Sequence, residues 1–353
     1  MPPGVAMQWR GALLTWRGEV PLSAQVQGAG TEAALGFLHR AQESTGVGAL
    51  PRGFHLKTGW TGPSAGATAS TITALLAARV PGASELIGPA ASWLAGQAPS
   101  LKHPRGVGAA LHAFLDLTEV DPAGGRWEGV IGGLTTQLIL SQDPAGTWTA
   151  KAGGTPACTA ASLAAAALDR VVRRGGDPRT ERTASQACEW AMGKQKTNGY
   201  FYACTWSGSE AVNPLLAELC DTVEGLLRVG LARDNKHYRM AALTTLRHLL
   251  KQIPPRGAMY GAWTSEWHHE RYRDPGGTAH LARLCRMALA APSPERSGLD
   301  LAGAAQVLRE RAHQSRLGAV LGPEVAGGVP GAVPVWGRSG PWLISVPATA
   351  EVI

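Results

Sequence analysis

The sequence is poor in charge and in cysteine, and it has no long apolar run. Asp, Glu, Lys and Arg make up 17% of its 353 residues, where about a quarter is usual. The five cysteines are odd in number and show no short paired spacing, which argues against a disulfide framework. No stretch is apolar enough to span a bilayer, and the N-terminus lacks the pattern of a signal peptide. We therefore expect a soluble, cytoplasmic protein with free thiols.

Missing motifs also disfavour the binding of nucleic acids, nucleotides and metals. The net charge is +7, but no Lys/Arg run or basic stripe accompanies it, so we expect no nucleic-acid partner. The sequence contains no glycine-rich phosphate loop, no nucleophile elbow and no Cys/His dyad. Residues 268–270 (HHE) with Asp274 could suggest a metal, but their spacing matches no helical metal motif. We expect neither a metal nor a cofactor.

One phrase recurs along the chain: Gln-x-x-x-Gly-x-aromatic. It occurs at 142–148 (QDPAGTW) and at 195–201 (QKTNGYF), and looser copies begin at Gln252 and at Gln42, the latter reaching Gly53. Most copies close one predicted helix and precede another whose start is small and apolar. A phrase that recurs roughly every 50 residues is typical of a repeat architecture.

The segments between these phrases have the pattern of helix pairs. In each pair the first helix is apolar on nearly all faces, which is typical of a buried helix, and the second is amphipathic. The apolar helices are predicted at 65–79, 158–173 and 215–230, the amphipathic stripes at 183–191 and 238–250, and further helices at 31–43, 107–117, 129–142, 276–290 and 299–315.

Buried inner helices that alternate with amphipathic outer helices form an α/α toroid when they repeat around a circle. We therefore predict an all-α fold, with a toroid of five or six helical hairpins over residues 1–317. The remainder, 318–353, is rich in Gly and Pro and contains Trp336 and Trp342. There we predict an extended C-terminal arm that docks on the toroid and includes a short strand at 341–346.

The repeats resemble those of the terpenoid-cyclase and protein-prenyltransferase toroids, whose Gln…Gly…Trp motifs end outer helices. A sharper resemblance spans nearly the full length. Residues 55–76, 198–230, 257–286 and 328–337 look like successive landmarks of bacterial toroid proteins of polysaccharide biosynthesis, the VpsJ-like group. This resemblance implies a glycan-related context and does not define a reaction.

Departures from these families bear on function. Where the VpsJ-like proteins usually begin the first inner helix with a Tyr-Pro-Glu-Thr-Thr-Gly phrase, this chain has 64–68 (SAGAT), without a carboxylate. The histidine usual before the threonine of the "GLL" helix is missing at 220–222 (CDT). The Asp-x-Asp-Asp acid motif of the cyclases and an Asp-Asp-x-x-Asp diphosphate motif are absent too. These absences disfavour a terpenoid cyclase.

Carboxylates near the inner-helix starts are the candidate catalytic groups, because in a toroid these starts and the loops before them line one mouth of a funnel. Asp221 and Glu224 lie three residues apart and share a helix face, where they could act as general acid and base. Glu266 and Asp274, in the loop before 276–290, are the other candidates. Alternatively, Asp221 caps its helix and Glu224 suits the dipole of the first turn.

Aromatic and histidine side chains of the loops are the candidate sugar-binding groups. The chain has 12 Trp against 5 Tyr and 4 Phe, and flat indole rings stack on pyranose faces. The candidates are Trp60, Tyr200, Trp206, Tyr260, Trp263, Trp267, His269 and His280. In the alternative interpretation the Trp side chains are structural wedges that hold loops on the toroid rim, and for Trp60, Trp206 and Trp263 both interpretations stay open.

Together these patterns predict a carbohydrate-active toroid protein that hydrolyses, eliminates or epimerises within an oligo- or polysaccharide. If it is an enzyme, we expect the glycoside hydrolase or lyase type. A non-catalytic glycan-binding or polysaccharide-assembly protein is one alternative, and a terpenoid cyclase or prenyltransferase-like enzyme is another. The expected partner is a glycan or another small-molecule ligand. The sugar, the linkage and the oligomeric state stay open.

Overall fold

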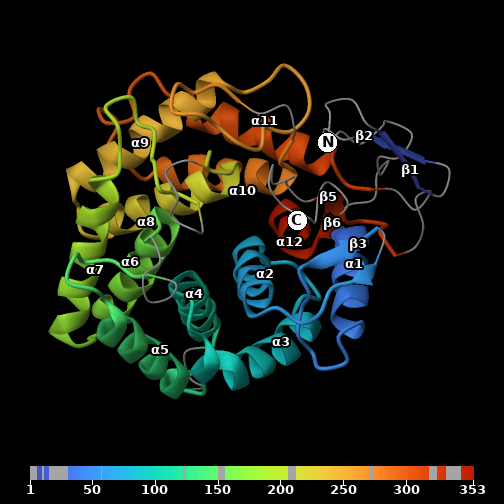
Figure 1. The fold of residues 1–353 in the computed structure, drawn as a ribbon, viewed down its shortest axis with the longest axis horizontal. Helices are drawn as coiled ribbons and strands as arrows, with labels where there is room; N and C mark the ends of the chain where they lie inside the picture. The colour runs from blue at the N-terminus through green and yellow to red at the C-terminus, as the bar shows by residue number, and fades with distance from the viewer. Residues whose placement is uncertain are drawn as a thin grey trace.

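In the computed structural model the helices form a closed ring of two concentric layers (Figure 1). The structure describes residues 6–9, 12–15, 31–56, 58–121, 125–149, 156–205, 212–269, 273–317, 324–330 and 343–353. Within them the inner layer comprises α2 (Ala65–Ala78), α4 (Pro104–Val120), α6 (Cys158–Arg173), α8 (Leu216–Ala232), α10 (Pro275–Ala288) and α12 (Val346–Val352). The outer layer comprises α1 (Thr31–Glu43), α3 (Ser84–Gln97), α5 (Glu128–Ser141), α7 (Pro178–Met192), α9 (Lys236–Lys251) and α11 (Leu301–His313).

Each inner helix packs against the inner helix before it and the one after it, and α12 packs against α2 to complete the circle. Each of the first five inner helices packs against the outer helix that follows it, while α12 packs against α1 from the other end of the chain. Because one outer helix separates successive inner helices, the inner helices run in one direction and begin at the same end of the ring. The predicted all-α toroid is confirmed, with six helix pairs in the described part.

Small residues allow the inner helices to pack closely around α6. A Cβ on Gly108 of α4 would lie 3.3 Å from the Cα of Ala164. On the other side of α6, a Cβ on Gly225 of α8 would overlap the Ser162 carbonyl group. Ala161 and Ala165 are fully buried. This explains why the sequence of an inner helix is made of small apolar residues on nearly every face.

The recurrent glutamine joins neighbouring outer helices. Gln142, after α5, donates from Nε2 to the carbonyl of Gly146 at 3.0 Å and to that of Thr183 on α7 at 2.9 Å. Gln195, after α7, donates in the same way to Gly199 at 3.3 Å and to Ala241 on α9 at 2.8 Å. The phrase therefore ties each loop and two outer helices into one unit, away from the starts of the inner helices.

The looser copy at Gln42 follows the same rule with a different glycine. Gln42 donates to the carbonyls of Gly48, at 2.7 Å, and of Leu86 on α3, at 2.8 Å. The predicted partner, Gly53, instead lies on a strand, where a Cβ would overlap the Ile344 carbonyl. Both positions need glycine, but the helix-linking role belongs to Gly48, whose φ is 79°.

Replacing Gly199 by alanine should lower the free energy of unfolding by about 1–2 kcal/mol, because its φ of 81° is strained for an L-residue. The new Cβ would also lie 2.9 Å from the Thr244 methyl group of α9. Gly132→Ala is the matched control, since Gly132 is exposed in the middle of α5 with open space around it. The control should gain roughly 0.5–1 kcal/mol. Urea denaturation measures both, and equal effects would contradict the strain argument.

Short strands complete the fold at the two ends of the chain. β1 (Ala6–Trp9) and β2 (Ala12–Thr15) form an antiparallel hairpin. A four-stranded sheet has the order β4 (Gly59–Trp60), β3 (Gly53–His55), β6 (Leu343–Ser345), β5 (Val329–Pro330). The predicted strand at 341–346 corresponds to β6. It leads directly into α12, a helix that was not predicted from the sequence, so the C-terminal segment supplies the last inner helix of the ring.

Two further observations concern the thiols and the membrane. All five cysteines are free and buried, which agrees with the expectation of free thiols and no disulfide framework. Among the described residues, the helices are all too short or too polar to cross a bilayer.

Candidate functional site

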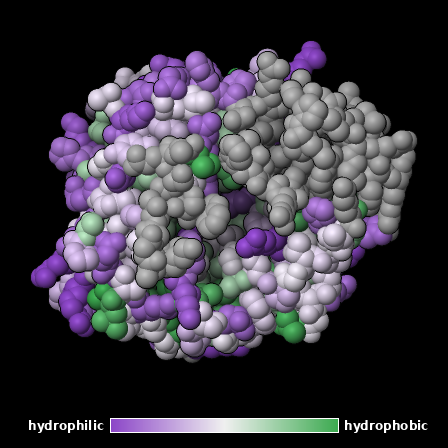
Figure 2. Space-filling model, in the orientation of Figure 1, coloured by the Kyte–Doolittle hydropathy of each residue, from purple (hydrophilic) through white to green (hydrophobic). Residues whose placement is uncertain are grey.

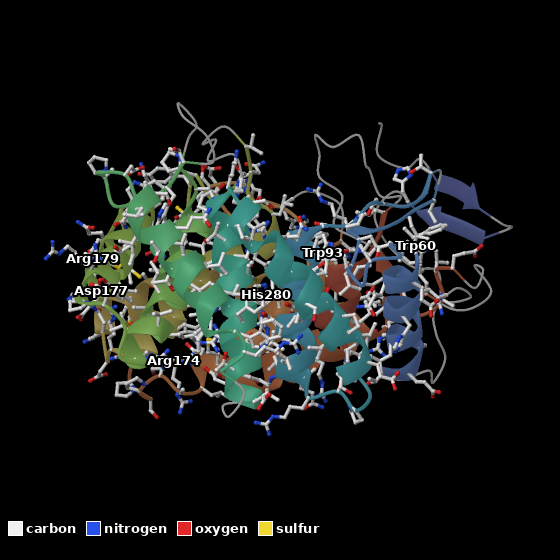
Figure 3. All side chains as sticks on the ribbon, turned by 90° about the horizontal axis from the view of Figure 1, so that it is seen from below. Trp60, Trp93, Arg174, Asp177, Arg179 and His280 are labelled. Atoms are coloured by element: carbon white, nitrogen blue, oxygen red, sulfur yellow. The ribbon has the colours of Figure 1, made fainter. Side chains whose placement is uncertain are left out.

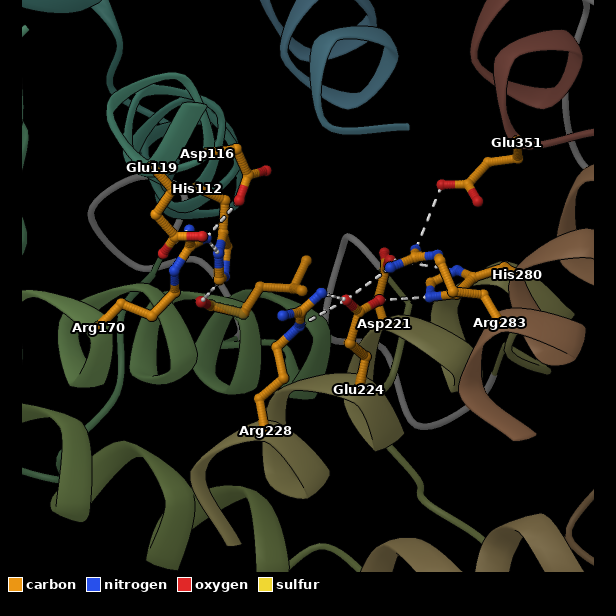
Figure 4. Close-up of polar contacts among 11 residues, drawn as sticks. His112, Asp116, Glu119, Arg170, Asp221, Glu224, Arg228, His280, Arg283 and Glu351 are labelled. Carbon is orange, nitrogen blue, oxygen red and sulfur yellow. Dashed lines mark hydrogen bonds and ion pairs between the residues drawn. The ribbon is translucent and has the colours of Figure 1, made fainter. Parts of the chain in front are cut away.

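Charged side chains of the inner helices converge on the axis of the ring, although these helices are otherwise apolar. Figure 4 shows them projecting from α4, α6, α8, α10 and α12. Figure 2 shows a hollow near the centre of the ring, where hydrophilic residues are visible. Charges that are removed from water need partners, and these charges form two paired clusters. We name them the Glu224 cluster and the Arg170 cluster.

Glu224, on α8, is the centre of the first cluster and is only 5% exposed. Its Oε1 accepts from Arg228 Nε at 2.7 Å and from Arg283 Nη1 at 2.8 Å, and its Oε2 lies 2.6 Å from His280 Nε2. Burial alone raises the pKa of this carboxyl. The charges of Arg283 and Arg228 and the His280 hydrogen bond outweigh burial, so the pKa lies well below its usual value. Glu224 is therefore ionised at neutral pH.

Asp221 lies one helical turn before Glu224 and is paired differently. Its Oδ2 accepts from Arg105 Nη2, on α4, at 2.5 Å. The Asp221 side chain is 13% exposed and the Arg105 side chain 41% exposed. Asp221 is the sixth residue of α8 and does not cap it; Glu218 does, by accepting from the backbone N–H of Leu215 at 2.9 Å. The capping alternative for Asp221 is therefore wrong.

His280 lies between these two carboxylates. It is the sixth residue of α10, and its Nδ1 is 3.9 Å from Asp221 Oδ1. Arg283, one turn further along α10, continues the chain of contacts: it binds Glu224 and reaches Glu351 of α12 at 3.3 Å. Three neighbouring inner helices thus meet at the Glu224 cluster. The structure brings the predicted residues Asp221, Glu224 and His280 together.

The Arg170 cluster lies further along the inner helices, on α4 and α6. Arg170 pairs with Asp116 at 2.7 Å and with Glu119 at 2.7 Å. His112 is buried, which lowers its pKa to about 3, so the ring is neutral. Its Nε2 donates to the Leu163 carbonyl at 3.1 Å, so its Nδ1 accepts from Arg170 at 3.2 Å. These groups are fully engaged with one another, and we assign them a structural role.

The two other predicted carboxylates lie outside both clusters. Asp274 is 2% exposed and caps α10, accepting from the backbone N–H of Gly277 at 2.8 Å. Burial raises its pKa to about 6. This is the position of a capping residue, with almost no surface for a substrate. Glu266 is exposed and accepts from the neighbouring Ser265 hydroxyl, which lowers its pKa. Among the described contacts, none links Glu266 to Asp221.

Three of the predicted aromatic residues form a core where the loop before α10 meets the loop after α7. Trp263 is fully buried, Tyr200 is 4% exposed and Trp267 is 6% exposed. The Tyr200 hydroxyl donates to the Trp263 carbonyl at 3.2 Å, and the Trp267 indole donates to the Asn198 carbonyl at 3.1 Å. Their rings contact one another edge-on or tilted. The burial of Trp263 leaves no ring face for a sugar, which favours the interpretation of this residue as a structural wedge.

The remaining candidates are more accessible but already have ring partners. Tyr260 is half-buried, with His269 stacked on one face at 3.5 Å and the Arg273 guanidinium 4.0 Å from its centroid. Trp60 is half-buried and packs on Phe54 with centroids 5.2 Å apart. Figure 3 shows Trp60 beside the strands and far from His280, which lies near the middle of the molecule. Trp206 lies outside the described residues.

Four partners of the site were not predicted from the sequence: Arg105, Arg228, Arg283 and Glu351. One signal was available. Arg228 follows Glu224 by four residues on a helix that is apolar on most faces, and such a spacing forms an ion pair. Charges on so apolar a helix have no outer surface to occupy, so they indicate the axis of the ring. The other partners come from α4, α10 and α12, and their proximity depends on ring closure.

Two surface grooves flank the outer helix α5 and offer less chemistry. One, of about 430 Å³, is lined by Glu128, Arg174, Asp177 and Arg179 among others. Its charges are paired: Arg174 with Glu128 at 2.5 Å and Arg179 with Asp177 at 2.7 Å. Figure 3 shows Arg174, Asp177 and Arg179 at an outer edge of the molecule. The other groove, of about 510 Å³, is lined by uncharged residues. The axial clusters are the better candidate site.

With this geometry the chain is similar in structure to solved α/α-toroid glycoside hydrolases. One is the unsaturated glucuronyl hydrolase from Bacillus sp. GL1, with a TM-score of 0.71, 15% identity and coverage of 91% of this chain and 93% of that one. Another is the GH76A α-1,6-mannanase of Salegentibacter sp. HEL1_6, with a TM-score of 0.65, 11% identity and coverage of 91% and 98%. No protein-family model and no curated protein matches the sequence.

Similarity at this level of identity establishes the fold and leaves the activity open. It confirms the resemblance to α/α toroids. It does not show the narrower relationships to terpenoid cyclases, prenyltransferases or the VpsJ-like group.

Proposed function

We propose that this protein binds an oligo- or polysaccharide at the axial end of the ring where the inner helices begin, and that Asp221 transfers a proton during its hydrolysis, elimination or epimerisation. The observation that carries the proposal is the position of Asp221. It is a partly exposed carboxylate near the start of α8, held by Arg105, beside the ionised Glu224 and the imidazole of His280. All three reactions need a positioned acid or base.

The structural neighbours and the sequence both support a glycan ligand. The neighbours include a glucuronyl hydrolase of glycosaminoglycan degradation and a mannanase in complex with α-1,6-mannotetrose. The VpsJ-like resemblance implies the same context. The mannanase becomes inactive when two adjacent aspartates are replaced, and this sequence contains no Asp-Asp pair. We therefore base the proposal on this chain's own Asp221 and His280, with no residue transferred from the mannanase.

A specific observation favours the second candidate, a glycan-binding protein without catalysis. Glycoside hydrolysis ordinarily uses two carboxyl groups that flank the bond. Here the negative charge of Glu224 is paired with Arg228 and Arg283, and Glu266 is exposed on its loop. Asp221 therefore has no free carboxylate partner among the described axial residues.

If the protein is an enzyme, the same observation ranks the reactions. Elimination and epimerisation need no such pair of carboxylates, and for this reason we favour them over hydrolysis.

A panel of neutral and uronic-acid oligosaccharides tests the proposal. We expect at least one to raise the melting temperature, because a ligand that binds the native state stabilises it. New absorbance from an unsaturated sugar would reveal elimination, and NMR of the products would reveal hydrolysis or epimerisation. Binding without any product would establish the binding protein. If no member of the panel shifts the melting temperature, the proposed function is wrong.

A further inference from the structure

His280 is the buried group that touches both carboxylates of the candidate site, and its two ring nitrogens face different partners. Nε2 lies 2.6 Å from Glu224 Oε2, whereas Nδ1 lies 3.9 Å from Asp221 Oδ1. The side chain is 7% exposed, so these neighbours and not bulk water determine where its proton lies. Figure 4 shows the imidazole beside Glu224 and Asp221 on the side of α10 that faces the axis.

Glu224 is held in place by three donors from α8 and α10. Its Oε1 accepts from Arg228 and from Arg283, so Oε2 is the oxygen that remains for His280. Because Glu224 is ionised at neutral pH, it acts as the acceptor, and His280 must donate to it from Nε2. The other nitrogen, Nδ1, is then the one that gains or loses a proton. A carboxylate that fixes the tautomer of a histidine in this way also stabilises its protonated form.

We propose that Glu224 and His280 are positioning residues for Asp221: Glu224 holds the proton on Nε2 of His280, and Nδ1 exchanges a proton with Asp221. This inference rests on the proposed function of Asp221. At 3.9 Å the two atoms are not hydrogen-bonded, and a small rotation of either side chain would bring them together. Asp221 can also contact a ligand, since its side chain is 13% exposed beside the partly exposed Arg105.

The exchange between Asp221 and His280 moves one proton and changes no other covalent bond. Asp221 removes a proton from the substrate and becomes a neutral carboxylic acid. That proton moves from Asp221 to Nδ1, which gives an aspartate anion and an imidazolium. The imidazolium retains its Nε2–H bond to Glu224, whose negative charge stabilises it. In the reverse direction Nδ1 returns the proton to Asp221, which delivers it to the substrate.

Charged groups from four inner helices lie around His280, and each can be replaced separately. From α8 it faces Asp221 and Glu224, with Arg228 behind Glu224. On α10 itself, Arg283 binds Glu224, and Asp274 caps the helix. From α4, Arg105 reaches His280 only through Asp221, and from α12, Glu351 reaches it only through Arg283. The last contact supplies a control: Glu351→Gln changes the cluster without touching His280.

Nitrogen NMR of the full chain with 15N-labelled histidine tests this assignment without any ligand. The His280 signals are identified by their loss in His280→Gln. We expect Nε2 to carry the proton in the wild type. Glu224→Gln should weaken this preference, because it replaces the charged acceptor of Nε2 by a neutral amide that can also donate. Asp221→Asn and Glu351→Gln should leave the proton on Nε2.

Two outcomes would overturn the inference: a proton on Nδ1 with Nε2 unprotonated in the wild type, or an unchanged tautomer preference in Glu224→Gln. If Glu224→Gln does not fold, the tautomer of the wild type still decides it. Failure of the oligosaccharide panel would refute the proposed function and leave these spectra unaffected. Success of the panel with the wrong tautomer would refute only the relay.

Discussion

Replacing Glu224 by alanine should lower the free energy of unfolding by about 3–5 kcal/mol, the cost of removing one partner from a buried ion pair. The variant would leave Arg283 with Glu351 alone and Arg228 without its described carboxylate partner. It would also leave the Nε2 of His280, which is 7% exposed, without an acceptor. Urea denaturation at neutral pH measures the loss.

The control and the pH dependence make this prediction specific. Glu310→Ala, at an exposed position of α11, should change the free energy of unfolding by less than about 0.5 kcal/mol. The pKa of Glu224 is lower in the folded chain than its unfolded value of about 4.3. Its stabilisation is therefore present above about pH 4.3 and lost as the pH falls through the folded pKa. A wild type and an alanine variant of equal stability at pH 7 would contradict the buried anion.

The repeat and the helices were predictable because each depends on local sequence. The buried helix 158–173 was predicted from its small apolar residues and has these bounds in α6. The glutamine phrase was predicted to close outer helices, and Gln195 does so by binding the next loop and α9. The short helix α12 escaped prediction, because seven residues in a Gly/Pro-rich segment have too little periodicity of their own. Its packing against α2 and α10 stabilises it.

The candidate site was predictable only in part, because its contacts cross from one inner helix to another. Asp221 and Glu224 share a face by spacing alone, and this was correctly predicted. The ion pairing of Glu224 depends on Arg283, which lies 59 residues further along the chain. It depends also on the closure of the ring. In the loop before α10, local composition was misleading. Its composition suggested a sugar platform, yet Trp263 is buried among aromatic neighbours, since a polar loop also needs an anchor.

Asp221→Asn should reduce turnover of an accepted glycan by about 10²–10⁴-fold, the usual contribution of a general acid or base. Asparagine has nearly the same shape, and its side-chain oxygen can still accept from Arg105, so the fold and the ligand affinity should be retained. The substitution removes the group that takes and returns the proton. The measurement is kcat for the best substrate of the panel, with a thermal-shift titration of the same variant to report binding.

The matched control is Asp234→Asn, on the turn before α9, where the aspartate side chain is 93% exposed and pairs with Arg239. Its φ of 50° lies in the left-handed region, which asparagine tolerates well. The control should keep full turnover. If Asp221→Asn keeps it too, Asp221 is not the proton-transfer group. If Asp221→Asn loses binding together with turnover, the carboxylate holds the ligand, because a residue acting only in proton transfer would leave the affinity unchanged. Retained binding with lost turnover is the result that separates a catalytic Asp221 from a glycan-binding one.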